Sequence, residues 1–380
     1  DPERTNFGYQ KSDIYQEYDA SIWETTGLAR LSRTISRSYT SNRHREGSFE
    51  RPEESVDGTF SRNYSETEYI GSYDDNGRII RNAPPRVVLA TSQSYDGMNR
   101  YTRTHIEQDF NGAIWANLGK AVLEETRSWS WSSDNRKAES LNAPDREIDP
   151  VFGQTRLWGG GDFDSPLTQF DGSQSKSYIR TLYTRSYDED TSKQTDVAPV
   201  AVGYSWNFDG MANPGTNLGY QKTDIFQQFS GTIWETGGPA RLETVISRGH
   251  TSDNEGRGSF EVPVGMNGET ADGSYSRSYL VTSYKESYDG QGRINPNHAP
   301  RVTEGYSHSY DGLKTYTRAE ITQLYNPDVW ASLGKTVLFE TTTKSWSSDG
   351  ATVTEHKDDP APEWMDTPFG ETPLFGGGAY

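Results

Sequence analysis

The chain has 380 residues, of which 31% are hydrophobic and 12% aromatic, and its 37 basic and 55 acidic residues give a formal net charge of −18. This charge excludes a nucleic-acid binder, because phosphate contacts need clustered Lys and Arg and no basic block occurs. The absence of cysteine excludes disulfides, thiolate zinc sites and iron–sulfur clusters, and no stretch approaches the ~20 apolar residues of a membrane-spanning helix.

The first element along the chain is a block, here called block B, that occurs four times. It begins with Tyr, has Ile five residues later and Gln two residues after that, and ends in Ile/Val-Trp followed four residues later by Gly. Its repeated residues are Trp23, Trp115, Trp234 and Trp330, and Gln16, Gln108, Gln227 and Gln323. The Trp–Gly spacing, with Pro239 and Pro327 in two copies, predicts short strands or one helical turn rather than a long helix.

A second block, block A, occurs three times between the copies of block B. It opens at Asp57-Gly58, Asp171-Gly172 or Asp272-Gly273 and closes on a Ser-Tyr-Asp that ends at Asp74, Asp188 or Asp289. The order is therefore B-A-B-A-B-A-B. A Gly-rich tail shared by the second and fourth B blocks divides the chain into two expected halves, 1–163 (B-A-B) and 164–380 (A-B-A-B). The first half lacks an opening A block, as expected of a chain cut from a longer tandem array.

The residues that follow each B block indicate β-structure. Residues 337–348 are rich in β-branched and aromatic residues, and Asp349-Gly350 then predicts a hairpin into residues 351–354. Further Asp-Gly pairs, at Asp96, Asp209 and Asp311, predict turns. We therefore expect an all-β fold of tandem-duplicated antiparallel modules, sandwich-like or solenoid-like. Because hydrophobic residues are few, the repeated Trp, Ile and Tyr residues are expected to form Tyr/Trp-rich cores.

Few polar residues favour a chemical role over a structural one. The four Gln residues are interpreted as buried amides at a strand edge or bulge, with a glycan contact as the alternative. Trp131 is interpreted as a core residue, with sugar stacking as its alternative. The acidic clusters Asp74-Asp75, Asp188-Glu189-Asp190 and Asp358-Asp359 lack the EF-hand pattern and are expected to be turn residues, with Ca²⁺ binding as the alternative. The Gly triplets at 159–161 and 376–378 are expected to be joints, and Asn63-Tyr64-Ser65 is a possible glycosylation site.

One local motif resembles a known family. Tyr73-Asp74-Asp75-Asn76-Gly77-Arg78 and Tyr288-Asp289-Gly290-Gln291-Gly292-Arg293 are similar to the Tyr-Asp-x-x-Gly-Arg core of YD (Rhs-type) repeats, which form a large β-shell. The full motif occurs twice here and covers a small part of the chain. No function is carried over from the family.

These observations predict a non-enzymatic structural subunit of an extracellular filament, fibre or surface layer. No catalytic residue, cofactor or resident metal is expected, because His residues do not recur, and no Gly-x-Ser-x-Gly, phosphate-loop or dinucleotide motif occurs. The expected partner is a further copy of the chain, which would cover an exposed sheet edge near the N-terminus. The alternative function is a glycan-binding or adhesive cell-surface module.

Overall fold

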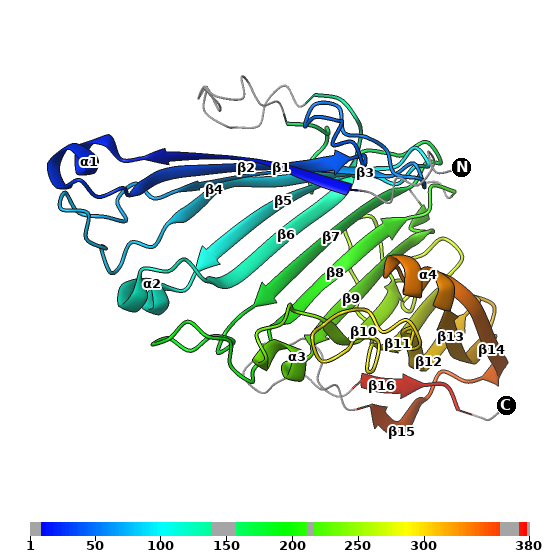
Figure 1. Ribbon diagram of the computed structural model, residues 1–380. Coiled ribbons are helices and arrows are strands. Elements are labelled where there is room, and N and C mark those ends of the chain that lie inside the picture. The colour runs from blue at the N-terminus through cyan, green and yellow to red at the C-terminus, as the bar shows by residue number, and fades with distance from the viewer. Residues whose placement is uncertain (1–8, 138–156, 212–215, 358–371, 378–380) are drawn as a thin grey trace. The chain divides into compact units, whose positions relative to one another are not determined.

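The computed structural model describes residues 9–137, 157–211, 216–357 and 372–377, and shows an almost entirely antiparallel β-fold (Figure 1). Fourteen strands, β1 to β14, form a sheet in which each strand pairs with its neighbours in chain order. The chain divides into two compact units, Asp1–Tyr178 with Asp188–Ser192, and Ile179–Tyr187 with Lys193–Tyr380. The predicted all-β class is confirmed.

The strands are long, and they contain the Tyr-, Thr- and Ser-rich runs of both blocks. Their bounds are β1 (Tyr9–Tyr18), β2 (Leu31–Ser41), β3 (Phe60–Glu68), β4 (Arg86–Tyr95), β5 (Tyr101–Phe110), β6 (Leu123–Ser133), β7 (Gln174–Leu182), β8 (Val200–Phe208), β9 (Tyr220–Phe229), β10 (Leu242–Thr251), β11 (Tyr275–Ser283), β12 (Arg301–Tyr310), β13 (Tyr316–Tyr325) and β14 (Leu338–Ser348).

Each B block folds as a strand, a short helix and a second strand, which we call a B hairpin. The helices are α1 (Ala20–Thr26), α2 (Gly112–Leu118), α3 (Gly231–Glu235) and α4 (Pro327–Leu333). In α1 the Asp19 carboxylate accepts a hydrogen bond from the Ile22 N–H, and Gly27 ends the helix in a left-handed conformation with φ +72°. The prediction that no long helix forms is confirmed, but the flanking strands have 10 or 11 residues and are not short.

Each A block contributes a strand, a loop and a second strand. We call these loops the Tyr-Asp loops: loop 1 (69–85), loop 2 (183–199) and loop 3 (284–300). In loop 1 the Asp74 carboxylate accepts hydrogen bonds from the N–H groups of Asn76 and Arg78, and Asp289 in loop 3 does the same for its own turn. The YD-like motif is therefore a self-contained tight turn.

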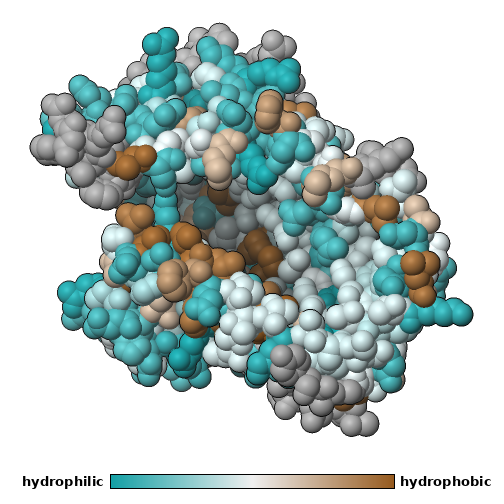
Figure 2. Space-filling view, turned by 90° about the vertical axis from the view of Figure 1, so that its right-hand side faces the viewer, coloured by the Kyte–Doolittle hydropathy of each residue, from teal (hydrophilic) through white to brown (hydrophobic). Residues whose placement is uncertain are grey.

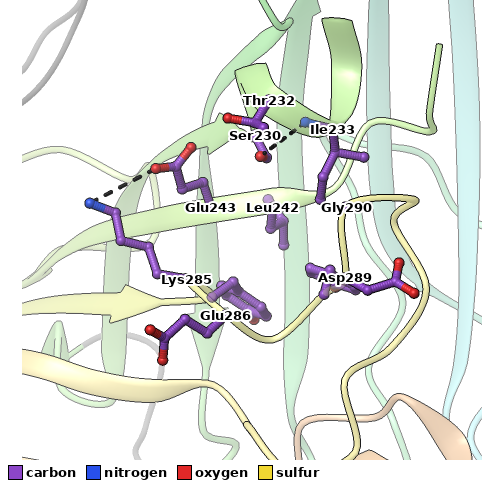
Figure 3. A pocket seen from close by; sticks show the side chains of 11 residues that line it. Ser230, Thr232, Ile233, Leu242, Glu243, Lys285, Glu286, Asp289 and Gly290 are labelled. Carbon is purple, nitrogen blue, oxygen red and sulfur yellow. Dashed lines mark hydrogen bonds and ion pairs between the residues drawn. The ribbon is translucent and has the colours of Figure 1, made fainter. Parts of the chain in front are cut away.

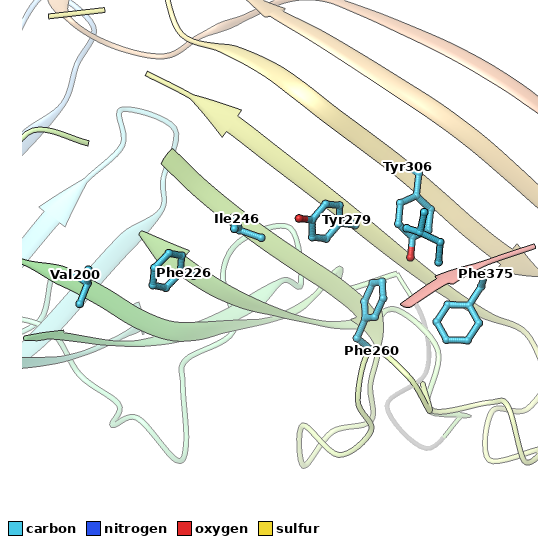
Figure 4. Close-up of a cluster of buried hydrophobic side chains, with 8 residues drawn as sticks. Val200, Phe226, Ile246, Phe260, Tyr279, Tyr306 and Phe375 are labelled. Atoms are coloured by element: carbon cyan, nitrogen blue, oxygen red, sulfur yellow. The ribbon is translucent and has the colours of Figure 1, made fainter. Parts of the chain in front are cut away.

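Alternating residues along the strands bury one face of the sheet. In β3 the burial alternates residue by residue from Phe60 to Thr67. Figure 4 shows the main core of the second unit, where side chains from five neighbouring strands meet Phe260 and the C-terminal segment. Its buried members are Val200, Phe226, Ile246, Phe260, Tyr279, Tyr306, Leu374 and Phe375. The first unit has a smaller core of Ile35, Tyr39, Phe49, Tyr64 and Leu157.

The predicted hairpin between residues 337–348 and 351–354 is wrong. The turn at Asp349-Gly350 exists, but β15 (Thr352–Lys357) leaves the large sheet and pairs with β16 (Thr372–Phe375) in a separate two-stranded sheet. The pairing brings Leu374 and Phe375 into the core of the second unit. Burial of these two side chains explains why β15 does not continue the large sheet.

Candidate functional site

A pocket of about 290 Å³ lies in the second unit between α3 and loop 3 (Figure 3). The Lys285 ammonium faces the Glu243 carboxylate at 3.9 Å. Asp289 points to its own turn, whose N–H groups lower the pKa of its carboxyl. The remaining lining residues are Ser230, Thr232, Ile233, Leu242, Tyr284, Glu286, Tyr288 and Gly290.

The chemistry of this pocket is limited. Ser230 is occupied as the N-cap of α3, where its hydroxyl accepts from the Ile233 N–H. The lining includes three carboxylates and one Lys. Of these, Glu243 and Lys285 pair with each other, and Asp289 accepts hydrogen bonds from its own turn. The pocket lies where α3 and β10 of a B hairpin meet loop 3 of the following A block. The Lys285–Glu243 ion pair connects these two modules.

The other acidic and glycosylation candidates have structural surroundings. Within residues 9–137, 157–211, 216–357 and 372–377 no group of three or more metal-ligating side chains converges. Asp188 accepts hydrogen bonds from Thr191 in its own loop, and Asp358-Asp359 lie outside the described residues. Asn63 is part of β3, and its side-chain amide donates to the Ser38 hydroxyl at 3.1 Å. A glycan on Asn63 would replace this cross-strand contact.

The four Gln residues of block B are not the buried amides that the sequence suggested. Gln16 is exposed, and Gln108, Gln227 and Gln323 are partly buried. All four precede the irregularity in strand pairing near the helix, which in the first copy falls between Glu17 and Tyr18. They therefore lie near a bulge, but the bulge does not bury them.

Three of the four block-B Trp residues have the core position that was expected. Trp115 is 1% exposed, and its indole N–H donates to the Ile80 carbonyl of loop 1 at 3.1 Å. The Tyr73 ring meets its face edge-on at 5.8 Å. In the second unit Trp234 and Trp330 are also buried, and their indole N–H groups donate to carbonyls of loops 2 and 3 respectively. Each buried Trp is therefore covered by the Tyr-Asp loop that precedes it in the sequence.

Trp23 is the exception. It is 56% exposed, because no Tyr-Asp loop precedes α1 in the described residues. Its helix is covered on the other side, where Arg30 donates to the Gly77 carbonyl of loop 1 at 2.7 Å and Ile22 is buried. Among the described residues, the expected core role of Trp23 is therefore wrong. Its own block has the usual residues, so the difference from the other three copies lies in the Tyr-Asp loop that covers each of them.

The first strand extends this exposed surface. β1 pairs with β2 on one side, and β2 is the one partner that the strand order gives it. Along β1, the side chains of Tyr9, Ile14 and Tyr18 are all at least half exposed. β1 and Trp23 together form a surface that we call the leading edge.

The last strand of the large sheet is open in the same way. β14 pairs with β13 alone in the strand order. Val337, just before β14, and Leu338 and Phe339, its first two residues, are exposed, Phe339 by 65%. We call β14 and these residues the trailing edge. In Figure 2 hydrophobic residues appear as separate brown groups on a surface that is otherwise mostly hydrophilic or neutral.

Sequence reasoning missed a row in which basic side chains, Arg277 among them buried, alternate with aromatic rings. In the second unit the cross-strand row runs through Trp206, Lys222, His250, Arg277, His308, Arg318 and Trp346. Arg277 is 2% exposed and lies 3.6 Å from the centre of the Phe375 ring. Its burial lowers the pKa of its guanidinium. The alternation of basic residues on neighbouring strands was the signal, but it becomes visible once the register is known.

The Gly triplets supply hydrogen-bond acceptors for one Arg of this row and for one Arg of the corresponding row in the first unit. The Arg103 guanidinium donates to the Gly159 carbonyl at 2.6 Å, and Arg318 donates to the Gly376 carbonyl at 2.7 Å. Both Gly residues have positive φ values, and a Cβ would lie within 2.5 Å of a Ser hydroxyl. The triplets thus bring the backbone close to a buried Arg and are more than joints. Trp131, beside Arg103, is buried as expected.

Comparison with known proteins identifies no relative. No family model, curated protein or solved structure matches the chain. Among the described residues, no helix is both long enough and apolar enough to cross a membrane.

Proposed function

We propose that this chain is a non-enzymatic structural subunit of an extracellular filament, fibre or surface layer, and that copies associate through the open edges of their sheets. The observation that carries the proposal is the contrast between Trp23 and its three buried equivalents. A residue that three modules bury under a Tyr-Asp loop is exposed in the fourth. A module supplied by another copy would cover it.

Two general properties of β-proteins support this proposal. Open edge strands present unpaired backbone groups, and monomeric proteins protect them with charged residues, Pro or covering loops. Terminal modules of soluble repeat arrays have polar outer faces. Besides its charged residues Lys11, Asp13 and Glu17, the leading edge exposes Ile14, Tyr18 and Trp23. Besides Glu340 and Lys344, the trailing edge exposes Val337 and Phe339. Location outside the cell is proposed from the composition, which is acidic, rich in Ser, Thr and Tyr, and free of Cys.

The test is assembly as a function of concentration. Light scattering should increase with protein concentration, and negatively stained samples should contain regular filaments or sheets. The double variant Ile14→Lys/Tyr18→Lys, which adds two charges to the leading edge, should remain monomeric. Its matched control is Met211→Lys/Leu313→Lys, which adds the same charge at exposed turn residues away from both edges and should assemble like the wild type.

Two results would contradict the proposal. Wild-type protein that stays monomeric at every concentration would exclude self-assembly. Equal loss of assembly in the edge variant and the control would show a general effect of charge. The exposed Trp23 ring also fits stacking on a sugar, so a monomeric protein that binds a glycan array through Trp23 would favour the alternative of an adhesive surface module.

A further inference from the structure

We infer that the leading edge of one copy receives the trailing edge of a second copy, head to tail, in a register that places Asp13 opposite Lys344. This inference deepens the proposed function and rests on it. It commits to a second copy as the occupant of the β1 edge. The argument uses the strand directions, two cross-strand rows and the spacing of the helices.

Strand direction permits this junction. Neighbouring strands alternate in direction along the sheet, so β1 and β14, at positions one and fourteen, run oppositely. A β14 strand beside β1 of the next copy continues the antiparallel alternation. It also places α4 and α1 at the same edge of the joined sheet. Pairing of two β1 strands would place the two α1 helices at opposite edges and leave both Trp23 side chains uncovered.

The register follows if the ends of β14 and β1 are aligned across the junction in the same way as the ends of paired strands within each B hairpin. Tyr9 pairs with Ser41 at the end of β2, and Tyr316 pairs with Ser348 at the end of β14. A level junction therefore sets Ser348 of one copy opposite Tyr9 of the next. Counting along both strands then places Ser345 opposite Ser12.

In this register a row of alternating charges continues across the junction. Within the second unit Glu320 is opposite Lys344, and within the first unit Asp13 is opposite Arg37, with their charged groups 3.5 Å apart. The junction adds Lys344 opposite Asp13, so the row alternates acid, base, acid, base. A shift by two residues would instead place Lys344 opposite Lys11, a like-charge pair that is destabilising. The level register has one like-charge pair of its own, Glu17 opposite Glu340, but Glu17 already forms an ion pair with Arg33 at 3.0 Å.

The neighbouring row gives the same result. Arg318 is opposite Trp346, with the guanidinium 5.7 Å from the indole ring, and Lys11 is opposite Tyr39 with its ammonium 5.8 Å from the phenol ring. The junction places Trp346 opposite Lys11. Cations and aromatic rings then alternate across the junction, as they do along the row of the second unit.

The helices also fit. Strands are spaced by about 4.8 Å, so two B hairpins with an A hairpin between them have helices roughly 19 Å apart, and a Tyr-Asp loop fills the gap. Directly joined B hairpins have helices about 10 Å apart, which is the distance of packed helices. Trp23 would then face Val337, the equivalent of Arg30, on the side of α4 that none of the described loops covers.

Cross-linking tests the register directly, because the chain has no native cysteine. A Ser12→Cys chain is mixed with a size-tagged Ser345→Cys chain and oxidised mildly under conditions in which the wild type assembles. Directly opposite residues have Cα atoms about 4.5–5.5 Å apart, within the range of a disulfide. The matched control replaces the second chain by Ser347→Cys, whose diagonal distance of roughly 7–8 Å is too long. All three Ser residues are exposed.

We expect covalent heterodimers at least tenfold more abundant in the Ser12→Cys/Ser345→Cys mixture than in the control. Equal yields from the two mixtures, with normal assembly, would overturn this register and leave the proposed function intact. Covalent homodimers of Ser12→Cys alone would show that two leading edges pair, which also overturns the inference. A wild type that never assembles would refute both proposals.

Discussion

Replacement of Trp115 by Ala should destabilise the first unit far more than replacement of Trp23. A Trp side chain buries up to about 200 Å², and apolar burial contributes about 25 cal/mol per Å². Trp115 is 1% exposed and Trp23 is 56% exposed, so the burial lost is worth about 5 kcal/mol for Trp115 and about 2 kcal/mol for Trp23. The lost hydrogen bond to the Ile80 carbonyl adds about 1 kcal/mol. The expected difference is about 4 kcal/mol.

Native-state hydrogen exchange on peptides from β1 to β6 measures this difference, because both Trp residues belong to the first unit. The protein concentration is kept low enough that no assembly occurs. Trp330→Ala, in the other unit, serves as the control and should leave the protection of these peptides unchanged. Equal losses of protection for Trp23→Ala and Trp115→Ala would refute the reasoning that a neighbouring loop determines the burial of each Trp.

Two further predictions concern single residues. His250 is buried, and desolvation, with a contribution from Lys222, lowers the pKa of its imidazole to about 4. The unfolded chain therefore takes up the proton first, and the free energy of unfolding of the second unit should fall by up to about 3 kcal/mol between pH 6.5 and pH 4. Denaturant titrations across this range check the loss, and His250→Tyr, which introduces the residue at the equivalent position 39, should remove it. For the glycines, Gly97→Ala should cost about 2 kcal/mol more than Gly27→Ala in thermal or chemical unfolding. Both have φ values above +70°, but a Cβ on Gly97 would lie 2.5 Å from the Asp57 carbonyl oxygen while one on Gly27 meets nothing within 4 Å; equal costs would contradict this reading.

Much of the local structure could be predicted because the chain repeats it. Trp115, Trp234 and Trp330 are core residues, and Asp96-Gly97 and Asp311-Gly312 form the expected turns, in which the Asp carboxylates accept backbone hydrogen bonds. These features depend on residues close in sequence. A residue pattern that recurs in several copies is also unlikely to arise by chance, so it predicts structure more securely than a single occurrence.

The features that could not be predicted depend on contacts between distant segments. Arg103 and Gly159 are 56 residues apart in the chain, and neither the spacing nor the composition indicates that a buried guanidinium would use a Gly carbonyl. The hairpin expected after β14 failed for the same reason. Its residues have strong strand propensity, but the core formed with Phe375 determines where β15 pairs.

Trp23 shows that the repeated sequence alone does not determine which of its side chains are buried. Its block has the same Tyr, Ile, Gln, Trp and Gly as the inner copies, and its helix has the same N-cap contact and left-handed Gly as α2. The local sequence therefore determines the fold of the hairpin and its helix. Whether the Trp is buried depends on the loop of the neighbouring module. In an array held together by nearest-neighbour interfaces, an end without a polar cap loses the stabilisation of one interface. The exposed Ile14 and Trp23 at one edge of the sheet and Phe339 at the other leave that interface available to a second copy, and this is the physical basis of the proposed assembly role.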